Sequence, residues 1–206
     1  MELSEATVRY LFATTWLPPG GSDRSVAVPG GSTRAIDTAG NLLHIAMWSL
    51  RRDGVMEFEQ LRPIEKEPVR ALGGKPFAAF RLVDGGASRP GLEGALLHAA
   101  GRVDGGDLGV RGLVRALDLD NRSPWGTVCA HCFAEASAAG LVERKGRLFP
   151  KVVFTDIAAV EALRGRHDDL RAARGAYLDA EPDLTGAVMS DCLRTVADAY
   201  SPDLGD

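Results

Sequence analysis

The sequence contains few cysteines, few aromatic residues and no long apolar run. Three cysteines in 206 residues are too few for a disulfide framework, and an odd number is typical of a reducing compartment. No apolar run approaches the ~20 residues that span a bilayer, and the first residues lack the basic and apolar regions of a signal peptide. We therefore expect a cytoplasmic protein without a transmembrane helix.

A basic excess is also missing. Lys and Arg number 24 against 28 Asp and Glu, which gives a formal net charge of −4. Because phosphate neutralisation supplies most of the affinity of a dedicated nucleic-acid binder, this balance disfavours DNA as the partner, although a local basic surface is compatible with it. Hydrophobic residues at 45% and charged residues at 25% are typical of a folded protein. The length fits two small domains or one, and we expect a single domain over residues 1–206.

Apolar residues recur at helical spacing over most of the chain. Helices are predicted over residues 4–16, 36–52, 92–101, 110–119, 124–139, 157–178 and 183–200. Pro124 directly after Ser123 marks a helix start, and Gly140 marks its end. Residues 18–34 and 59–76 are predicted to be loops, the first with a short strand at 25–28. The fold class is therefore mainly α.

Two short hairpins are predicted between these helices. One pairs residues 55–58 with 77–83, and the other pairs 141–144 with 148–154 around a turn at Lys145-Gly146. Each follows a helix that ends at a glycine, Gly54 or Gly140. This repetition predicts a single compact helical domain with small β-hairpins, built from two winged-helix-like units.

No catalytic or metal-binding pattern is evident. Cys129 and Cys132 lie one helical turn apart, but a structural zinc site needs four ligands and Cys192 is distant in sequence. His131 points away from Cys129 on an ideal helix, so it is a poor base for a thiol nucleophile. We expect metal-free thiols packed in the core, no catalytic residues and no cofactor. The sequence therefore predicts a protein that is not an enzyme.

Basic residues gather at several places, including residues 164–174 and the second predicted hairpin. The hairpin is the most suggestive, because cations on a wing can contact phosphates of lipid or of DNA. An ordinary solvated hairpin is the alternative, and the aromatic residue beside the cations equally fits core packing. The predicted lipid- or partner-binding residues are Arg144, Lys145, Arg147, Phe149 and Lys151.

The order of these elements resembles the Golgi phosphoprotein 3 family. The resemblance is strongest over residues 125–173, where a long helix leads to a Gly-terminated end, a small hairpin and a further helix: Ala139-Gly140-Leu141-Val142-Glu143-Arg144, Arg147-Leu148-Phe149-Pro150 and Val160-Glu161-Ala162-Leu163-Arg164. Residues 40–58, 92–99 and 183–200 resemble further helices of that family. The resemblance implies a mostly helical single domain that acts as an adaptor at a membrane surface or on a protein partner.

The sequence departs from the family at its phosphoinositide headgroup site. That site uses a tryptophan just before the first core helix, whereas Trp48 here lies within the helix. The arginine positions on the family's long helix fall at or near Cys129 and His131, so neither is carried over as a site residue. The family's apolar hairpin, used in membrane contact and self-association, has its nearest counterpart at residues 144–151, which are more charged. Homo-oligomerisation is left open.

The alternative function is a winged-helix DNA-binding transcriptional regulator, with residues 125–139 as recognition helix and 144–151 as wing. That helix offers Thr127, His131, Glu135 and Ser137 to the bases, and no Arg, Lys, Asn or Gln. Direct readout depends on those four missing types. The sequence therefore favours a non-enzymatic peripheral membrane or protein-binding adaptor, with an anionic membrane surface or a protein as partner.

Overall fold

The computed structural model describes residues 2–20, 24–61, 77–83, 88–103, 109–146 and 151–200. Its helices are α1 (Glu5–Leu11), α2 (Ala13–Trp16), α3 (Ala35–Arg52), α4 (Gly91–Ala100), α5 (Val110–Arg115), α6 (Pro124–Ala138), α7 (Ile157–Glu161), α8 (Arg164–Ala180) and α9 (Pro182–Ala199). Antiparallel hairpins join β1 (Ser25–Val28) to β2 (Gly31–Arg34), β3 (Met56–Leu61) to β4 (Phe77–Leu82), and β5 (Val142–Lys145) to β6 (Lys151–Phe154). The predicted fold class, mainly α with small hairpins, is confirmed.

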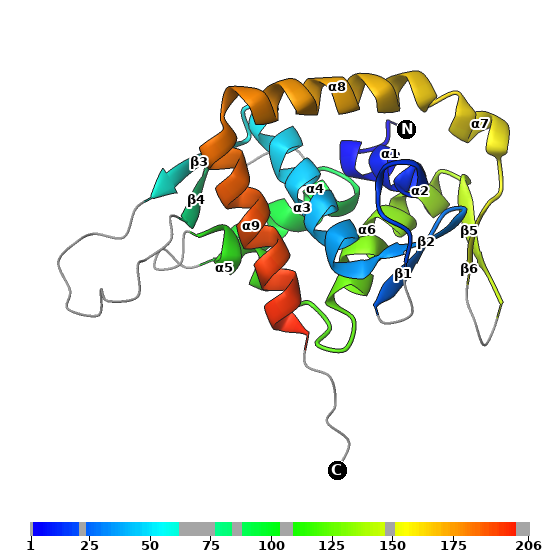
Figure 1. Ribbon diagram of the computed structural model, residues 1–206, viewed down its shortest axis with the longest axis horizontal. Coiled ribbons are helices and arrows are strands. Elements are labelled where there is room, and N and C mark those ends of the chain that lie inside the picture. The colour runs from blue at the N-terminus through cyan, green and yellow to red at the C-terminus, as the bar shows by residue number, and fades with distance from the viewer. Residues whose placement is uncertain are drawn as a thin grey trace, which may run out of the picture.

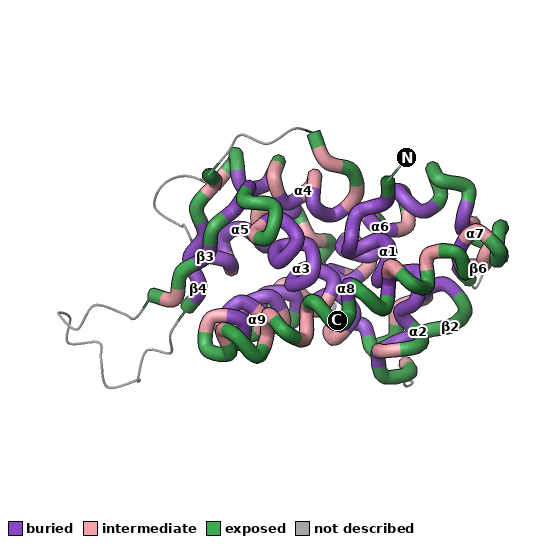
Figure 2. Tube along the Cα trace, turned by 90° about the horizontal axis from the view of Figure 1, so that it is seen from above, coloured by how far each residue is buried: buried purple, intermediate pink, exposed green. Residues whose placement is uncertain are grey.

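Helix α3 lies at the centre of the molecule. Figure 2 shows its trace buried along most of its length, and α1, α4, α6 and α9 pack against it. A helix that is apolar on nearly all sides is stable in water only when others enclose it. The side chains that α3 contributes to the main hydrophobic core are Ala35, Ala39, Leu42, Leu43, Ile45, Ala46, Met47 and Leu50.

Helices α3 and α6 end in the same way, which accounts for the two predicted helix-plus-hairpin units. Gly54 and Gly140 follow the two helices with φ of 70° and 73°, a left-handed conformation that glycine adopts without steric cost. The next amide then reaches back five residues: Val55 N donates to Leu50 O at 2.9 Å, and Leu141 N donates to Ala136 O at 3.0 Å. In both cases the chain turns directly into a strand.

The predicted turn of the second hairpin is wrong by a few residues. Lys145 belongs to β5 and is paired with Lys151 of β6, so the turn does not fall at the Lys145-Gly146 pair. Residues 147–150, which include the predicted site residues Arg147 and Phe149, lie outside the described residues. The pairing leaves both lysines at the distal end of the ladder.

The predicted N-terminal helix over residues 4–16 is interrupted. Phe12 separates α1 from α2 with φ of −107°, and its side chain is buried in a second apolar cluster formed with α1, α8 and β5–β6. The loop predicted over residues 18–34 contains β2 as well as the expected strand at 25–28, because Gly30 at φ 80° permits a tight turn. The long helix predicted over 157–178 divides into α7 and α8. Figure 1 shows α8 lying across one side of the helical body.

Gly40 sets how closely α3 and α9 approach, because a Cβ at this position would lie 2.9 Å from Leu193 Cγ. We expect Gly40→Ala to lower the free energy of unfolding by about 1–3 kcal/mol, since overpacking outweighs the better helix propensity of alanine. Chemical denaturation measures this change. Gly186→Ala on α9, where a Cβ meets open space, is the control and should raise stability by about 0.5–1 kcal/mol. Equal effects of the two substitutions would contradict the steric account.

Candidate functional site

The basic hairpin, defined here as β5, β6 and the residues between them, carries exposed cations. The structure brings together three of the five predicted site residues, Arg144, Lys145 and Lys151, all exposed. Lys145 and Lys151 stand directly opposite each other, an arrangement of like charges that destabilises a strand pair. One carboxylate compensates them in part, since Lys145 Nζ lies 2.9 Å from Glu143 Oε1. The described part of the hairpin thus keeps an excess of positive charge.

Apolar side chains accompany these cations. The guanidinium of Arg144 lies 4.7 Å from the ring centroid of Phe133 on α6. Ile157, the first residue of α7 and three residues after β6 ends, is 71% exposed, which is unusual for an isoleucine. Ile157 follows the end of the hairpin at which Val142 pairs with Phe154, so it lies at the opposite end of the ladder from Lys145 and Lys151.

The cysteines of α6 are placed for packing. Cys129 and Cys132 are buried free thiols, and burial raises the pKa of Cys129 to about 12 and that of Cys132 above its usual value. A thiol held protonated in this way is a poor nucleophile. Among the described residues, no three His, Cys, Asp or Glu side chains are grouped to hold a metal ion. None of the described helices combines the length and apolarity that crossing a membrane requires.

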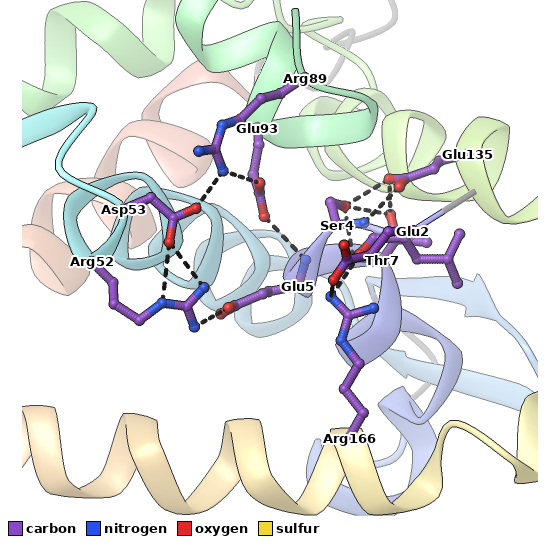
Figure 3. Close-up of polar contacts among 11 residues, drawn as sticks. Glu2, Ser4, Glu5, Thr7, Arg52, Asp53, Arg89, Glu93, Glu135 and Arg166 are labelled. Atoms are coloured by element: carbon purple, nitrogen blue, oxygen red, sulfur yellow. Dashed lines mark hydrogen bonds and ion pairs between the residues drawn. The ribbon is translucent and has the colours of Figure 1, made fainter. Parts of the chain in front are cut away.

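Glu135, which the DNA-binding alternative offered to the bases, is buried and holds the N-terminal segment (Figure 3). Its carboxylate accepts hydrogen bonds from Ser4 N, Ser4 Oγ and Thr7 Oγ1, each at 2.6 Å. Glu93 on α4 accepts a further one from Glu5 N at 3.1 Å. These bonds fasten the first turn of α1 to α4 and α6, so Glu135 has a structural role.

A chain of ion pairs continues from this point and lines a cleft of about 200 Å³. Arg52 pairs with Glu5 and Asp53, Asp53 Oδ2 lies 2.6 Å from Arg89, and Arg89 lies 3.5 Å from Glu93 (Figure 3). Burial raises the pKa of both Glu5 and Glu93. Since Arg52 and Arg89 each contact carboxylates, this network is internally compensated and forms a structural clamp.

A second cleft, of about 660 Å³, lies between the α1–α2 region and α8. We call it the arginine cleft; it is lined by Arg9, Thr15, Trp16, Leu17, Pro18, Arg171, Arg174, Gly175 and Leu178. The sequence pattern indicated the basic run at 164–174 but gave no indication of Arg9. Arg9 is distinguished only by being a cation in a helix whose other residues are buried. Arg9 is 3% exposed. The fold thus brings a buried arginine of α1 to the same cleft as two arginines of α8.

The arginines of this cleft lack the carboxylate partners of the first one. Within the described residues, no Asp or Glu forms an ion pair with Arg9, Arg171 or Arg174, and the Nε atoms of Arg9 and Arg174 are buried without a hydrogen-bond partner. Burial, followed by the charges of Arg174 and Arg171, lowers the pKa of Arg9 to about 10, against a smaller opposing effect of the Asp168 carboxylate. Each unsatisfied buried donor costs about 1–3 kcal/mol. The cleft therefore concentrates positive charge.

His44 on α3 lies behind the arginine cleft, 1% exposed and 3.2 Å from Arg174 Nη2. Burial and, next, the charge of Arg174 lower its pKa to about 3. Its ordinary pKa in the unfolded chain is about 6.5. Because the unfolded chain binds the proton first, the contribution of neutral His44 is complete above about pH 6.5 and is lost as the pH falls toward about 3, at up to ~1.4 kcal/mol per pH unit.

We therefore expect His44→Gln to flatten the decline of the unfolding free energy between about pH 6.5 and pH 4. Urea denaturation at several pH values measures this slope independently of any constant loss that the substitution causes. His98→Gln, at an exposed position on α4, is the control and should leave the slope as in the wild type. A slope unchanged in His44→Gln would contradict the assignment of a buried neutral imidazole.

Comparison with known proteins identifies no relative of this chain. The sequence matches no protein-family model, and neither a curated protein nor a solved structure matches the chain.

Proposed function

We propose that this protein is a non-enzymatic adaptor that docks onto an anionic membrane surface through the basic hairpin. The observation that carries the proposal is the pairing of Lys145 with Lys151, next to exposed Arg144. Like charges placed opposite each other cost stability in the free protein, and an anionic surface relieves that repulsion.

The packing of α6 supports an adaptor over the DNA-binding alternative. A recognition helix must present one face to the major groove, and α6 is instead enclosed by α1, α3 and α4. Its exposed residues are small: Ala130, Ala134, Ser137 and Ala138. Alanine offers no hydrogen bond to a base edge, so this surface is poorly suited to direct readout.

The buried thiols favour a binding role over thiol-based catalysis, because a protonated, inaccessible sulfur neither attacks a substrate nor binds a metal. The resemblance to the Golgi phosphoprotein 3 family, although no family match accompanies it, implies the same kind of role.

The test is cosedimentation with vesicles of phosphatidylcholine and phosphatidylserine. We expect the triple variant Arg144→Ser, Lys145→Ser, Lys151→Ser to bind roughly 100-fold more weakly than the wild type, because each basic residue near such a surface contributes about 1 kcal/mol. Adding Arg147→Ser should weaken binding further. The melting temperature should change little, since relief of the Lys145–Lys151 repulsion and loss of the Arg144 contact with Phe133 are small effects of opposite sign.

The matched control removes the same charge elsewhere, with Arg81→Ser, Arg115→Ser and Arg194→Ser at exposed positions on β4, α5 and α9. This control should retain most of the vesicle binding. Equal losses in the two triple variants would indicate a nonspecific charge effect and contradict a docking hairpin. A wild type that binds no vesicles would redirect the proposal to a protein partner, and salt-sensitive binding of duplex DNA through the hairpin would favour the regulator.

A further inference from the structure

Helix α8 presents a single basic face to the arginine cleft. Arg171, Arg174, Gly175 and Leu178 have the spacing i, i+3, i+4 and i+7, which places them along one side of a helix. Opposite them lies Arg9 of α1. The cleft thus has arginines on both walls, and Figure 1 shows α8 crossing the molecule beside α1 and α2.

Neighbouring side chains fix the orientation of the two more buried arginines. Arg9 lies 4.2 Å from the Trp16 ring centroid, and its Nη1 is 2.8 Å from His167 Nε2. Arg174 Nη2 donates to Asn41 Oδ1 at 3.1 Å and lies 3.2 Å from His44 Nδ1. Because a guanidinium only donates hydrogen bonds, both ring nitrogens accept and both histidines face the arginines as neutral groups. These contacts position the arginines. His167 Nδ1 in turn donates to Asp168 Oδ1 at 3.0 Å, so a carboxylate beyond the histidine offsets part of the charge of Arg9.

We propose that the arginine cleft is a binding site for a phosphate group. Three guanidinium groups without a described carboxylate partner match a multiply charged, multidentate oxyanion better than a monocarboxylate, because arginine binds phosphate through paired N–H donors. The Nε atoms of Arg9 and Arg174 are buried without a partner, so the fold leaves both guanidinium groups incompletely hydrogen-bonded. The site is preorganised, since its walls are already in place.

The rest of the lining indicates what carries the phosphate. Trp16, Leu17, Pro18 and Leu178 contribute apolar surface beside the arginines. A volume of about 660 Å³ exceeds what a single phosphate fills and is in the range of sites for small organic ligands. The ligand is therefore a phosphate ester with an apolar or aromatic part, either an acidic lipid headgroup or a soluble ester.

This site is separate from the basic hairpin and does not depend on the function proposed for it. It also differs from the headgroup positions that the family resemblance implies, since those fall on α6 near Cys129 and His131, whereas the cleft is formed by α1, α2 and α8.

The test measures binding of inorganic phosphate and phenyl phosphate to the full chain by titration calorimetry at constant ionic strength. We expect one site per chain, with phenyl phosphate binding more tightly than inorganic phosphate because of the apolar wall. Arg171→Gln removes an exposed guanidinium that makes no structural contact in the described residues, and should weaken binding about tenfold or more. Arg194→Gln, an exposed arginine of α9 outside the cleft, is its control and should bind as the wild type does.

A steric variant tests the same site without changing charge. A Cβ on Gly175 meets open space, so Gly175→Leu should fold, fill part of the cleft and also reduce binding at least tenfold. Gly165→Leu, on the same helix with equal space but outside the lining, is its control. Circular dichroism verifies that all four variants keep the wild-type helix content.

Vesicles containing phosphatidic acid distinguish the two sources of phosphate. Vesicle binding weakened by Gly175→Leu but not by Gly165→Leu identifies a lipid headgroup, and cleft-dependent binding of phenyl phosphate alone identifies a soluble ester. The basic-hairpin triple variant should bind phenyl phosphate as the wild type does, which separates this inference from the adaptor proposal. The inference is overturned if no probe binds, or if Arg171→Gln and Gly175→Leu bind every probe as tightly as their controls.

Discussion

The arrangement of the molecule follows from the need to enclose α3. Most of its surface is apolar, and α1, α4, α6 and α9 cover that surface. One stripe is different: Asn41, His44, Trp48 and Arg51 recur at helical spacing and face α8. Apolar packing cannot satisfy the polar members of this stripe, so the helix that covers it has to supply hydrogen-bond partners.

Helix α8 meets this requirement with a matching polar stripe. Arg174 contacts Asn41 and His44, while Tyr177 and Glu181, the residue that follows α8, accept hydrogen bonds from Arg51 at 2.7 and 2.9 Å. Only His167 and Leu170 of α8 are buried, so apolar contacts hold this helix to the body less than they hold α9, which is of similar length and buries six residues, Thr185, Val188, Asp191, Cys192, Thr195 and Val196. A helix attached through long polar side chains stands further from its neighbours than one attached through interlocked apolar side chains. The arginine cleft borders this polar attachment, since Arg174 belongs both to the stripe and to the lining of the cleft.

Local signals in the sequence predict an element well where its conformation depends only on residues near it in the chain. The ends of α3 and α6 were predictable because Gly54 and Gly140 satisfy a backbone requirement that no distant residue affects. The break at Phe12 was not, because a continuous apolar pattern spans it and the break depends on which cluster buries the phenylalanine. The hairpin turn was misplaced for a related reason: Lys145 and Gly146 suit a tight turn, but Lys145 is itself paired in the strand ladder, with Lys151.

The two candidate sites also differ in how well the sequence predicts them. The cations of the basic hairpin are neighbours in sequence, so composition alone reveals them. Arg9 and Arg174 are 165 positions apart (174 − 9), and only the docking of α8 on α1 and α3 brings them together. A single sequence does not indicate which distant residues come into contact, so it does not predict such a site.

The two clefts differ in whether carboxylates pair with their arginines, and this difference supports a binding role for the arginine cleft. Arg52 and Arg89 show how this fold treats a cation that serves structure, since carboxylates of α1 and α4 and Asp53 at the end of α3 surround both of them. The chain has 28 acidic residues and a net charge of −4, so carboxylates are not scarce. Asp168, whose charge reaches Arg9, contacts His167 and not the guanidinium itself. A direct carboxylate partner would stabilise the folded state and would also cancel the positive potential of the cleft. A fold that leaves a 3%-exposed arginine without such a partner tolerates a cost in stability, and binding of an anion at that position recovers it.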